Sequence, residues 1–483
     1  MLRQGLEEDR MRSTHPSLDR RRAGVLLHLT SLPGPHGLGD LGRPASRFMQ
    51  WLAASGWDLW QMLPTGPIGK GDSPYSSGSS FAIEPLLVSL EGLVDEGLLA
   101  RGALRAPTSL KRCLRADYAG ARRFKAPRWE AAFEAFTRLR RDRSRGYRGF
   151  LERSEHWLDP WCRWAVEHQG GDADFHAFQQ FILEGQWTHL RKEARRRGIS
   201  LFGDLPIFVP MESADVESNP KLFQLERNGR PRLVSGTPPD CFSRNGQLWG
   251  HPQYRWSEHR RTGYQWWIDR IRRQFQLFDL VRIDHFVGLI HAWMIPGNAR
   301  SARGGQWRKV PGRELLEAIH AELPDSALVA EDLGRVTPAV RKLRDDFALP
   351  GMFLLQHAFD GDGGPALPHA LPEHSVAYTG THDNDTTVSW WKSLPSSTRQ
   401  RITEYGGPPT RGPHELMTRL VMSSRANLGI IPMQDILGLD GKSRMNIPGK
   451  PSGNWRWRLG KGMLDIRVAR RMNRLAAVTG RLT

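Results

Sequence analysis

A short apolar run that ends abruptly in charge, D-L-V-R-I-D-H-F at 279–286, limits the folds open to this chain. Its aliphatic and β-branched residues are typical of a strand buried on both faces. Such a strand has reason to carry Arg282 and Asp284 only where its end opens into a polar site. For this run alone, a structural Arg–Asp pair inside the fold is an equally good interpretation. Two similar strand endings decide between the two readings.

Both of these later runs also end in carboxylates. The run A-L-V-A-E-D-L-G at 327–334 leads to Glu331, and the run beginning at Ser375 leads to His382 and Asp383. A single carboxylate at a strand end is commonly the cap of the next helix. Three endings in succession, separated by helix-like segments, indicate strand tips that converge at the mouth of a (β/α)8 TIM barrel, an α/β fold. An Asp, a Glu and a further Asp at one mouth are what glycosyl transfer through a covalent intermediate needs.

At these residues the sequence resembles the 4-α-glucanotransferases, also called amylomaltases or disproportionating enzymes, which form glycoside hydrolase family 77 of the α-amylase clan. The matching motifs keep the family's order from Ala23 onward. They are S-L-P-G-P at 31–35, D-S-P-Y at 72–75, G-D-L-P-I at 203–207, R-I-D-H-F at 282–286, A-E-D-L-G at 330–334, L-P-G-M at 349–352, Y-T-G-T-H-D-N-D-T-T at 378–387, R-M-N-I-P-G at 444–449 and G-N-W-R-W-R at 453–458. Each motif is weak alone, but their joint occurrence is highly specific.

The expected organisation is one catalytic barrel over residues 23–483, preceded by a flexible extension at 1–22. Barrel strands are expected at 24–29, 58–63, 200–209, 280–283, 327–330, 350–356, 376–379 and 429–433. The long stretch at about 64–199 predicts a helical insertion, with amphipathic segments at 129–140, 160–167 and 174–197. The resemblance implies cleft-covering loops at about 210–265 and no separate C-terminal β-domain.

The resemblance implies that Asp284 is the nucleophile, that Glu331 is the acid and base, and that Asp383 assists them. The implied activity is transfer of α-1,4-glucan segments between maltooligosaccharides, or to glucose, with retention of the anomer. An α-1,4-glucan hydrolase with the same site is the first alternative. A non-catalytic glucan-binding or basic scaffold protein is the second, and it predicts the loss of at least one of these carboxylates, all of which are present.

Further residues are candidates for binding sugar. Tyr75 follows a loop rich in Gly and Ser and is as well suited to stacking on a pyranose ring as to core packing. A buried Asp204 needs a donor, and we expect both Arg282 and a sugar hydroxyl in that role. The resemblance adds Asp240, Gln247, Trp249, His382 and Asn454, although Trp249 fits a core position equally well.

Composition and motifs limit the classes of partner and cofactor that the chain can bind. The formal charge of +18 raises the possibility of an acidic partner, but the arginines are scattered over polar helical faces and no nucleic-acid module is present. No metal-ligand spacing, dinucleotide fingerprint or phosphate loop occurs, so no metal and no cofactor is expected. Three scattered cysteines predict free thiols in a reducing compartment. The absence of a signal peptide or membrane span predicts a cytoplasmic protein, and nothing in the sequence indicates an oligomeric state.

Three positions depart from the family pattern: Val287 follows R-I-D-H-F, Ile83-Glu84 follows the Tyr75 loop, and Pro210-Met211 follows the third strand. These departures leave the catalytic trio intact. They are expected to affect subsite affinity, chain-length preference and the ratio of transfer to hydrolysis.

Overall fold

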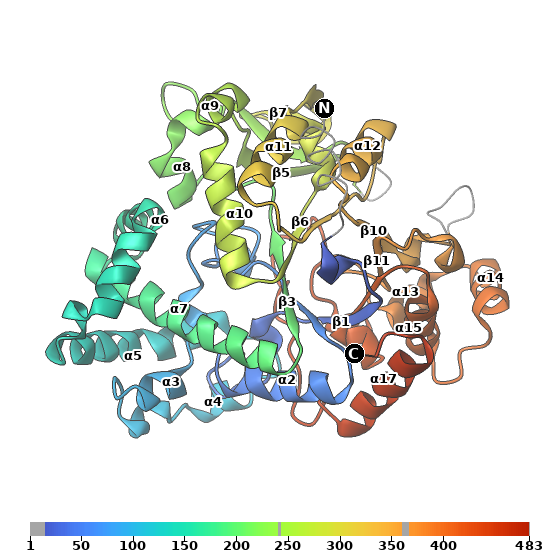
Figure 1. Ribbon diagram of the computed structural model, residues 1–483, viewed down its shortest axis with the longest axis horizontal. Helices are drawn as coiled ribbons and strands as arrows, with labels where there is room; N and C mark the ends of the chain where they lie inside the picture. Colours follow the sequence, from blue (N-terminus) through green and yellow to red (C-terminus); the bar gives the residue numbers. More distant parts are fainter. Residues whose placement is uncertain (1–14, 240–242, 360–366, 483) are drawn as a thin grey trace, which may run out of the picture.

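Parallel strands close a barrel in the computed structural model, which describes residues 15–239, 243–359 and 367–482 (Figure 1). Within this part of the chain the closed sheet has eight strands, in the order β1-β12-β11-β10-β9-β6-β3-β2. They are β1 (Arg22–Leu26), β2 (Leu59–Gln61), β3 (Ser200–Leu205), β6 (Leu280–Ile283), β9 (Leu328–Ala330), β10 (Gly351–Leu354), β11 (Ser375–Tyr378) and β12 (Leu428–Pro432). The predicted TIM barrel is confirmed, and each strand overlaps its expected position.

The register of the strands sets which side chains meet at the mouth. Asp204 at the end of β3 lies opposite Arg282 in β6, and Ile283 lies opposite Ala330 in β9. Asp284 and Glu331 each come one residue after that last pair. Because parallel strands end at the same edge of a sheet, the two carboxylates emerge side by side.

Helices cover the outside of the barrel between successive strands. Those outside the insertion are α2 (Arg43–Ala54), α8 (Ala214–Ser218), α9 (Trp256–Arg261), α10 (Gln265–Leu277), α11 (Gly312–Glu322), α12 (Pro338–Asp346), α13 (Thr387–Ser393), α14 (Ser396–Gly406), α15 (Pro413–Ser423), α16 (Met433–Ile436) and α17 (Ile466–Val478). In the described part of the chain no strand follows β12, and α17 packs against α2.

The insertion between β2 and β3 is helical, as predicted, but its helices are longer than expected. It comprises α3 (Leu90–Asp95), α4 (Thr108–Lys111), α5 (Tyr118–Arg138), α6 (Arg145–Gln169) and α7 (Ala173–Arg196), which gather on one side of the molecule in Figure 1. Pro127 lies inside α5 and Pro160 inside α6. Proline usually ends or kinks a helix. Both helices nevertheless continue past their proline. The turns on either side pack against the core, where Trp129, Trp157 and Trp161 are all buried.

A second sheet was not predicted. Its strands are antiparallel in the order β5-β4-β7-β8, with bounds β4 (Leu233–Thr237), β5 (Gln247–Pro252), β7 (His291–Pro296) and β8 (Gln306–Lys309). The region at about 210–265 was expected to hold cleft-covering loops, but it includes β4, and the segment at 247–252 forms β5. The Gly and Pro in this segment mask its strand character, and pairing with β4 supplies the hydrogen bonds.

The expected N-terminal boundary also needs correction. Residues 1–14 lie outside the described part, but the chain is already packed before residue 23. Pro16–Leu18 form a 3₁₀ turn, and Arg22 is the first residue of β1, 1% exposed and 2.8 Å from Asp58.

A large cluster of buried apolar residues runs from the barrel strands into the helices of the insertion and includes Val25, Val281, Ile430, Phe150 and Trp187. None of the helices in the described residues has the length and apolar character needed to cross a membrane.

Candidate active site

The C-terminal ends of the barrel strands open into a cavity of about 400 Å³, within the usual size of ligand sites. Seven segments far apart in the sequence line it. They are the loop at 70–76, the residues after β3 at 206–208, β5, the tips of β6 and β9, the loop after β11 with His382 and Asp383, and the segment at 446–455. Asp284, Glu331 and Asp383, the predicted trio, all face this cavity.

Arg282 lies beneath the floor of the cavity and contacts three carboxylates. Its Nη1 donates to both oxygens of Asp204 at 2.6 Å. Its Nη2 donates to Asp284 Oδ1 at 2.9 Å and lies 3.4 Å from Glu331 Oε2. The Tyr75 hydroxyl donates to Asp204 Oδ2 at 2.6 Å. These contacts fix the positions of Asp284 and Glu331 relative to one another.

The backbone adds to this arrangement. Asp284 N–H donates to Leu205 O, and Glu331 N–H donates to Ile283 O, each at 3.0 Å, so the tips stay hydrogen-bonded beyond the ends of the strands. His285 adopts a left-handed conformation with φ of 52°. Such a conformation is uncommon for a residue other than glycine. It accompanies a hydrogen bond from the His285 N–H to Glu331 Oε2.

Burial raises the pKa of both Asp284 and Glu331, and nearby carboxylates add to the rise while Arg282 opposes it. Burial lowers the pKa of Arg282, but Asp204, Glu331 and Asp284 outweigh that effect and raise it well above its usual value. The Asp284 and Glu331 side chains are 26% and 17% exposed. A permanently charged guanidinium beneath two carboxylates of raised pKa can hold one of them ionised while the other keeps its proton.

The loop after β11 carries His382 and Asp383. Asp383 Oδ1 accepts a hydrogen bond from Asn446 Nδ2 at 2.6 Å and lies 3.4 Å from His382 Nε2. Arg444 donates to the Asp383 carbonyl at 2.6 Å. Burial lowers the pKa of His382, so its imidazole is neutral near pH 7 and offers one donor and one acceptor.

Aromatic rings form one wall. The Tyr75 ring stacks on His382 with centroids 5.2 Å apart, and Trp455 lies 5.7 Å from Tyr75. In β5, the Trp249 ring meets the His285 ring edge to face, with centroids 4.9 Å apart. Trp249 Nε1 donates to Gln247 Oε1 at 3.2 Å. Tyr75 and Trp249 therefore line the cavity while they also pack against the core.

The other predicted binding residues differ in their placement. Gln247 and Asn454 line the cavity, and Asn454 holds its own loop through the backbone of Ile447 and Lys450. Asp204 is 2% exposed and lies behind the cavity surface, so its observed partners are Arg282 and Tyr75. Asp240 lies outside the described residues.

Several lining residues were not singled out from the sequence: His251, Asn446, Lys450 and Trp455. Asn446 and Trp455 belong to motifs that carried the family resemblance, and this was the available signal for them. The departures at Val287, Glu84 and Pro210 do not contribute to the described cavity lining. Val287 is 6% exposed within the core, and Glu84 is buried and accepts from the Ile68 and Leu86 amides.

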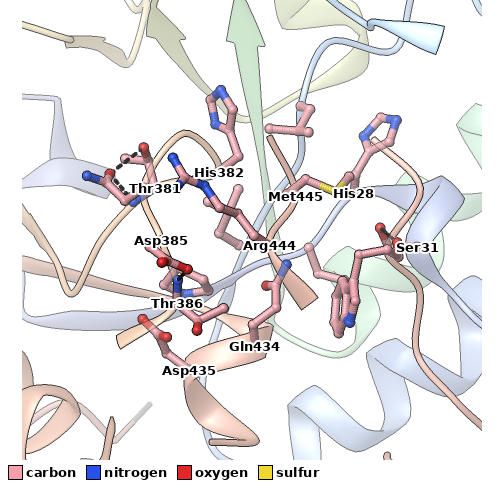
Figure 2. Close-up of a pocket in the computed structure, with 16 residues that line it drawn as sticks. His28, Ser31, Thr381, His382, Asp385, Thr386, Gln434, Asp435, Arg444 and Met445 are labelled. Atoms are coloured by element: carbon pink, nitrogen blue, oxygen red, sulfur yellow. Dashed lines mark hydrogen bonds between the residues drawn. The ribbon is translucent and has the colours of Figure 1, made fainter. Parts of the chain in front are cut away.

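A small hollow of about 30 Å³ lies beside the main cavity and shares His382 with it (Figure 2). His28, Asp385, Gln434 and Arg444 are among the residues around it. It is less than a tenth of the size of the main cavity, which offers the larger space for a sugar chain.

Potential metal ligands gather elsewhere. Among the described residues, the two groups whose ligand atoms lie within 4.8 Å of one another are His36, Asp40 and Glu91, and Glu167, His168 and Glu217. Neither group belongs to the cavity. In the first, the Lys125 ammonium lies 3.8 Å from Asp40 Oδ2 and already supplies a positive charge.

Comparison with known proteins places this cavity in context. The family model described as 4-alpha-glucanotransferase matches residues 27–172 and 163–463. A 4-alpha-glucanotransferase of Thermus thermophilus is 40% identical over 501 residues, which span 96% of this chain and 99% of the relative. A chloroplastic/amyloplastic 4-alpha-glucanotransferase of Solanum tuberosum is 39% identical and is covered over 87% of its length, with 96% of this chain aligned.

A solved structure shares the fold. The amylomaltase from Streptococcus agalactiae in complex with acarbose superposes with a TM-score of 0.92 at 31% sequence identity, covering 96% of this chain and 100% of that one.

Proposed function

Because this chain belongs to the 4-alpha-glucanotransferase family, we propose that its cavity transfers α-1,4-glucan segments between maltooligosaccharides, or to glucose, by a retaining double displacement. The observation that carries the mechanism is the shared contact of Asp284 and Glu331 with Arg282 Nη2, at 2.9 and 3.4 Å. Because both oxygens lie near the same nitrogen, Asp284 Oδ1 and Glu331 Oε2 can be no farther apart than the sum of these two distances. That sum is below the ~6.5 Å minimum between the carboxyl groups of inverting enzymes. This geometry favours direct attack by one carboxylate over activation of a water molecule.

In the first step Asp284 attacks the anomeric carbon while Glu331 gives its proton to the departing glycosidic oxygen. The carbon–oxygen bond to the leaving chain breaks, and a glycosyl-aspartate forms. Arg282 donates to Asp284 Oδ1, which leaves Oδ2 as the attacking atom. Burial raises the pKa of both groups, and it raises that of Asp284 well above its usual value. We assign the ionised role to Asp284 because its contact with Arg282 is the closer one, at 2.9 Å against 3.4 Å for Glu331.

In the second step Glu331 takes the proton of an incoming sugar 4-hydroxyl, and that oxygen displaces Asp284 from the anomeric carbon. Glu331 is then protonated again, and Asp284 is again a carboxylate. His382 and Asp383 hold hydroxyls of the sugar bound at the nucleophile, and Tyr75 supplies the flat surface beside it. Gln247, Trp249 and Asn454 contact the remaining sugar units at the rim, and no metal or cofactor takes part.

The cell compartment is also part of the proposal. Cys113 and Cys162 are free in the described structure, which fits a reducing compartment such as the cytoplasm.

Incubation with maltotriose, followed by chromatography of the sugars, tests the proposal. We expect glucose together with a ladder of longer maltooligosaccharides. Asp284→Asn should reduce the rate by on the order of 10⁴-fold. Asp345→Asn is the matched control, because its side chain is 61% exposed on α12, away from the cavity. Production of glucose and maltose alone would instead indicate a hydrolase, and unchanged maltotriose would contradict both activities.

A further inference from the structure

A second cleft, of about 500 Å³, lies on the outside of the barrel between the helical insertion and the segments that flank α8 and α10. We call it the outer cleft. It is lined by α6 around Trp157, by the loop at Ser79 and Phe81, by residues 214–222, and by residues 262–269. In Figure 1, α6, α8 and α10 lie on the same side of the molecule, and α8 packs against α6. The mechanism above makes no use of this cleft.

The lining of the outer cleft combines the edges of buried aromatic rings with exposed polar groups. Phe81 and Trp266 meet edge to face with centroids 6.5 Å apart, and His156 meets Phe81 at 6.3 Å. Gln265 and Thr262 are exposed at the rim. Phe81 and Trp266 are 6% and 9% exposed, so they offer ring edges to the cleft. The exposed ring of His156 can contact the C–H surface of a sugar, beside the Gln265 amide and the Thr262 hydroxyl.

The carboxylates of the outer cleft are compensated. Asp215 accepts from the Ser80 amide at 2.8 Å and interacts with Arg270. Asp269 accepts from Arg272 at 2.5 Å and from Gln265 at 2.9 Å. Lys221 is the remaining charged side chain in the described lining and is exposed. The other lining groups offer hydrogen bonds that an uncharged, polyhydroxylated ligand can use.

Two chain segments contribute to both the outer cleft and the catalytic cavity. Tyr75 lines the cavity, and Phe81, a few residues later, lines the cleft. Phe208 lines the cavity, and Ala214 lines the cleft. The Ala214 N–H donates to the Gly78 carbonyl at 2.9 Å, which ties the two segments together.

We propose that the outer cleft is a second binding site for α-glucan, which holds part of a long chain away from the bond that is cut. The inference rests on the proposed function, because a glucan polymer extends well beyond the catalytic cavity. Binding at a second site raises the effective concentration of the polymer at the first. It lowers KM for long chains and has no effect on a trisaccharide that occupies the cavity alone.

The test is the double variant His156→Ala/Gln265→Ala, compared with wild type on amylose and on maltotriose. Both side chains are exposed, so the fold is retained. We expect KM for amylose to rise at least about threefold, with unchanged kcat on amylose and unchanged kcat/KM on maltotriose. Thr262→Trp, which fills the cleft from its rim, should act in the same direction. His189→Ala/Gln400→Ala, a matched pair of exposed positions outside the cleft lining, should have no effect.

Direct binding separates failure of this inference from failure of the proposed function. In an Asp284→Asn background, calorimetric titration with maltoheptaose should detect two sites, and one site after the His156→Ala/Gln265→Ala change. Normal disproportionation of maltotriose, with an unchanged KM for amylose and a single site in both proteins, would overturn the outer-cleft proposal and leave the proposed function intact. Wild-type protein that leaves maltotriose unchanged would overturn the proposed function itself.

Discussion

Arg282 connects the buried support of the site to its reacting groups, since one guanidinium contacts Asp204, Asp284 and Glu331. Lysine keeps the charge but has a single nitrogen and cannot reproduce this fork. We expect Arg282→Lys to lower kcat for maltotriose disproportionation by about 10²–10³-fold. Arg467→Lys, at a side chain that is 86% exposed and paired with Asp465, should behave as wild type. An Arg282→Lys enzyme with normal kcat would show that the fork is dispensable.

Asp383 affects the titration of Glu331 as well as the substrate. Burial raises the pKa of Glu331, and the negative charge of Asp383 adds to that rise. Glu331 acts as the acid only while protonated, so kcat/KM falls as pH increases through its pKa. Asp383→Asn removes a negative charge near Glu331. The ionised form of Glu331 is then less destabilised, so the pKa of Glu331 falls. The alkaline limb of the kcat/KM profile should therefore move to lower pH, whatever the loss in rate. A shift to higher pH would contradict this coupling.

Single glycines show how tightly the elements pack. A Cβ at Gly24 in β1 would lie 2.4 Å from Leu59 Cβ and 2.8 Å from Leu59 O in β2. Gly24→Ala should therefore lower the free energy of unfolding by about 1–3 kcal/mol. Gly185, inside α7, is exposed and has nothing within 4 Å of an added Cβ. Gly185→Ala should raise the stability by about 0.5–1 kcal/mol, because alanine favours a helix. Urea unfolding of both variants measures the two effects, and shifts of the same sign would contradict this account.

At the scale of the whole molecule, Arg481 joins the C-terminus to the start of the barrel. The fully buried guanidinium donates to the carbonyls of Arg22, Met422, Ser424, Ala426 and Asn427. Arg481→Ala removes the donor that these carbonyls share, although those of Met422, Ser424 and Asn427 each keep one other donor. The change should cost about 3 kcal/mol. Thermal unfolding measures the loss. Arg470→Ala, at an exposed position on α17, is the control and should leave the unfolding temperature unchanged.

The order of strands and helices, and the residues at the strand tips, followed from local sequence. A barrel strand is a short apolar run, and the polar residues at its end follow it directly in the sequence. Asp284 and Glu331 could therefore be identified as site residues from the sequence alone. The motifs around them predicted the family, which the comparisons confirm. Helix ends were less predictable, since Pro127 and Pro160 lie within helices that the surrounding packing stabilises.

Other features form only where segments distant in the sequence come together, and these could be seen only in the tertiary structure. The sheet formed by β4, β5, β7 and β8 depends on pairing across long separations, and its strands have weak local patterns. The contact of Arg282 with Asp204 was expected from the sequence, because a buried Asp needs a donor. The contact of Asp383 with Asn446, by contrast, joins residues that no spacing relates. The outer cleft likewise exists only where the insertion meets α8 and α10. Sequence patterns report the local preferences of the chain, whereas these features arise from the packing of remote surfaces.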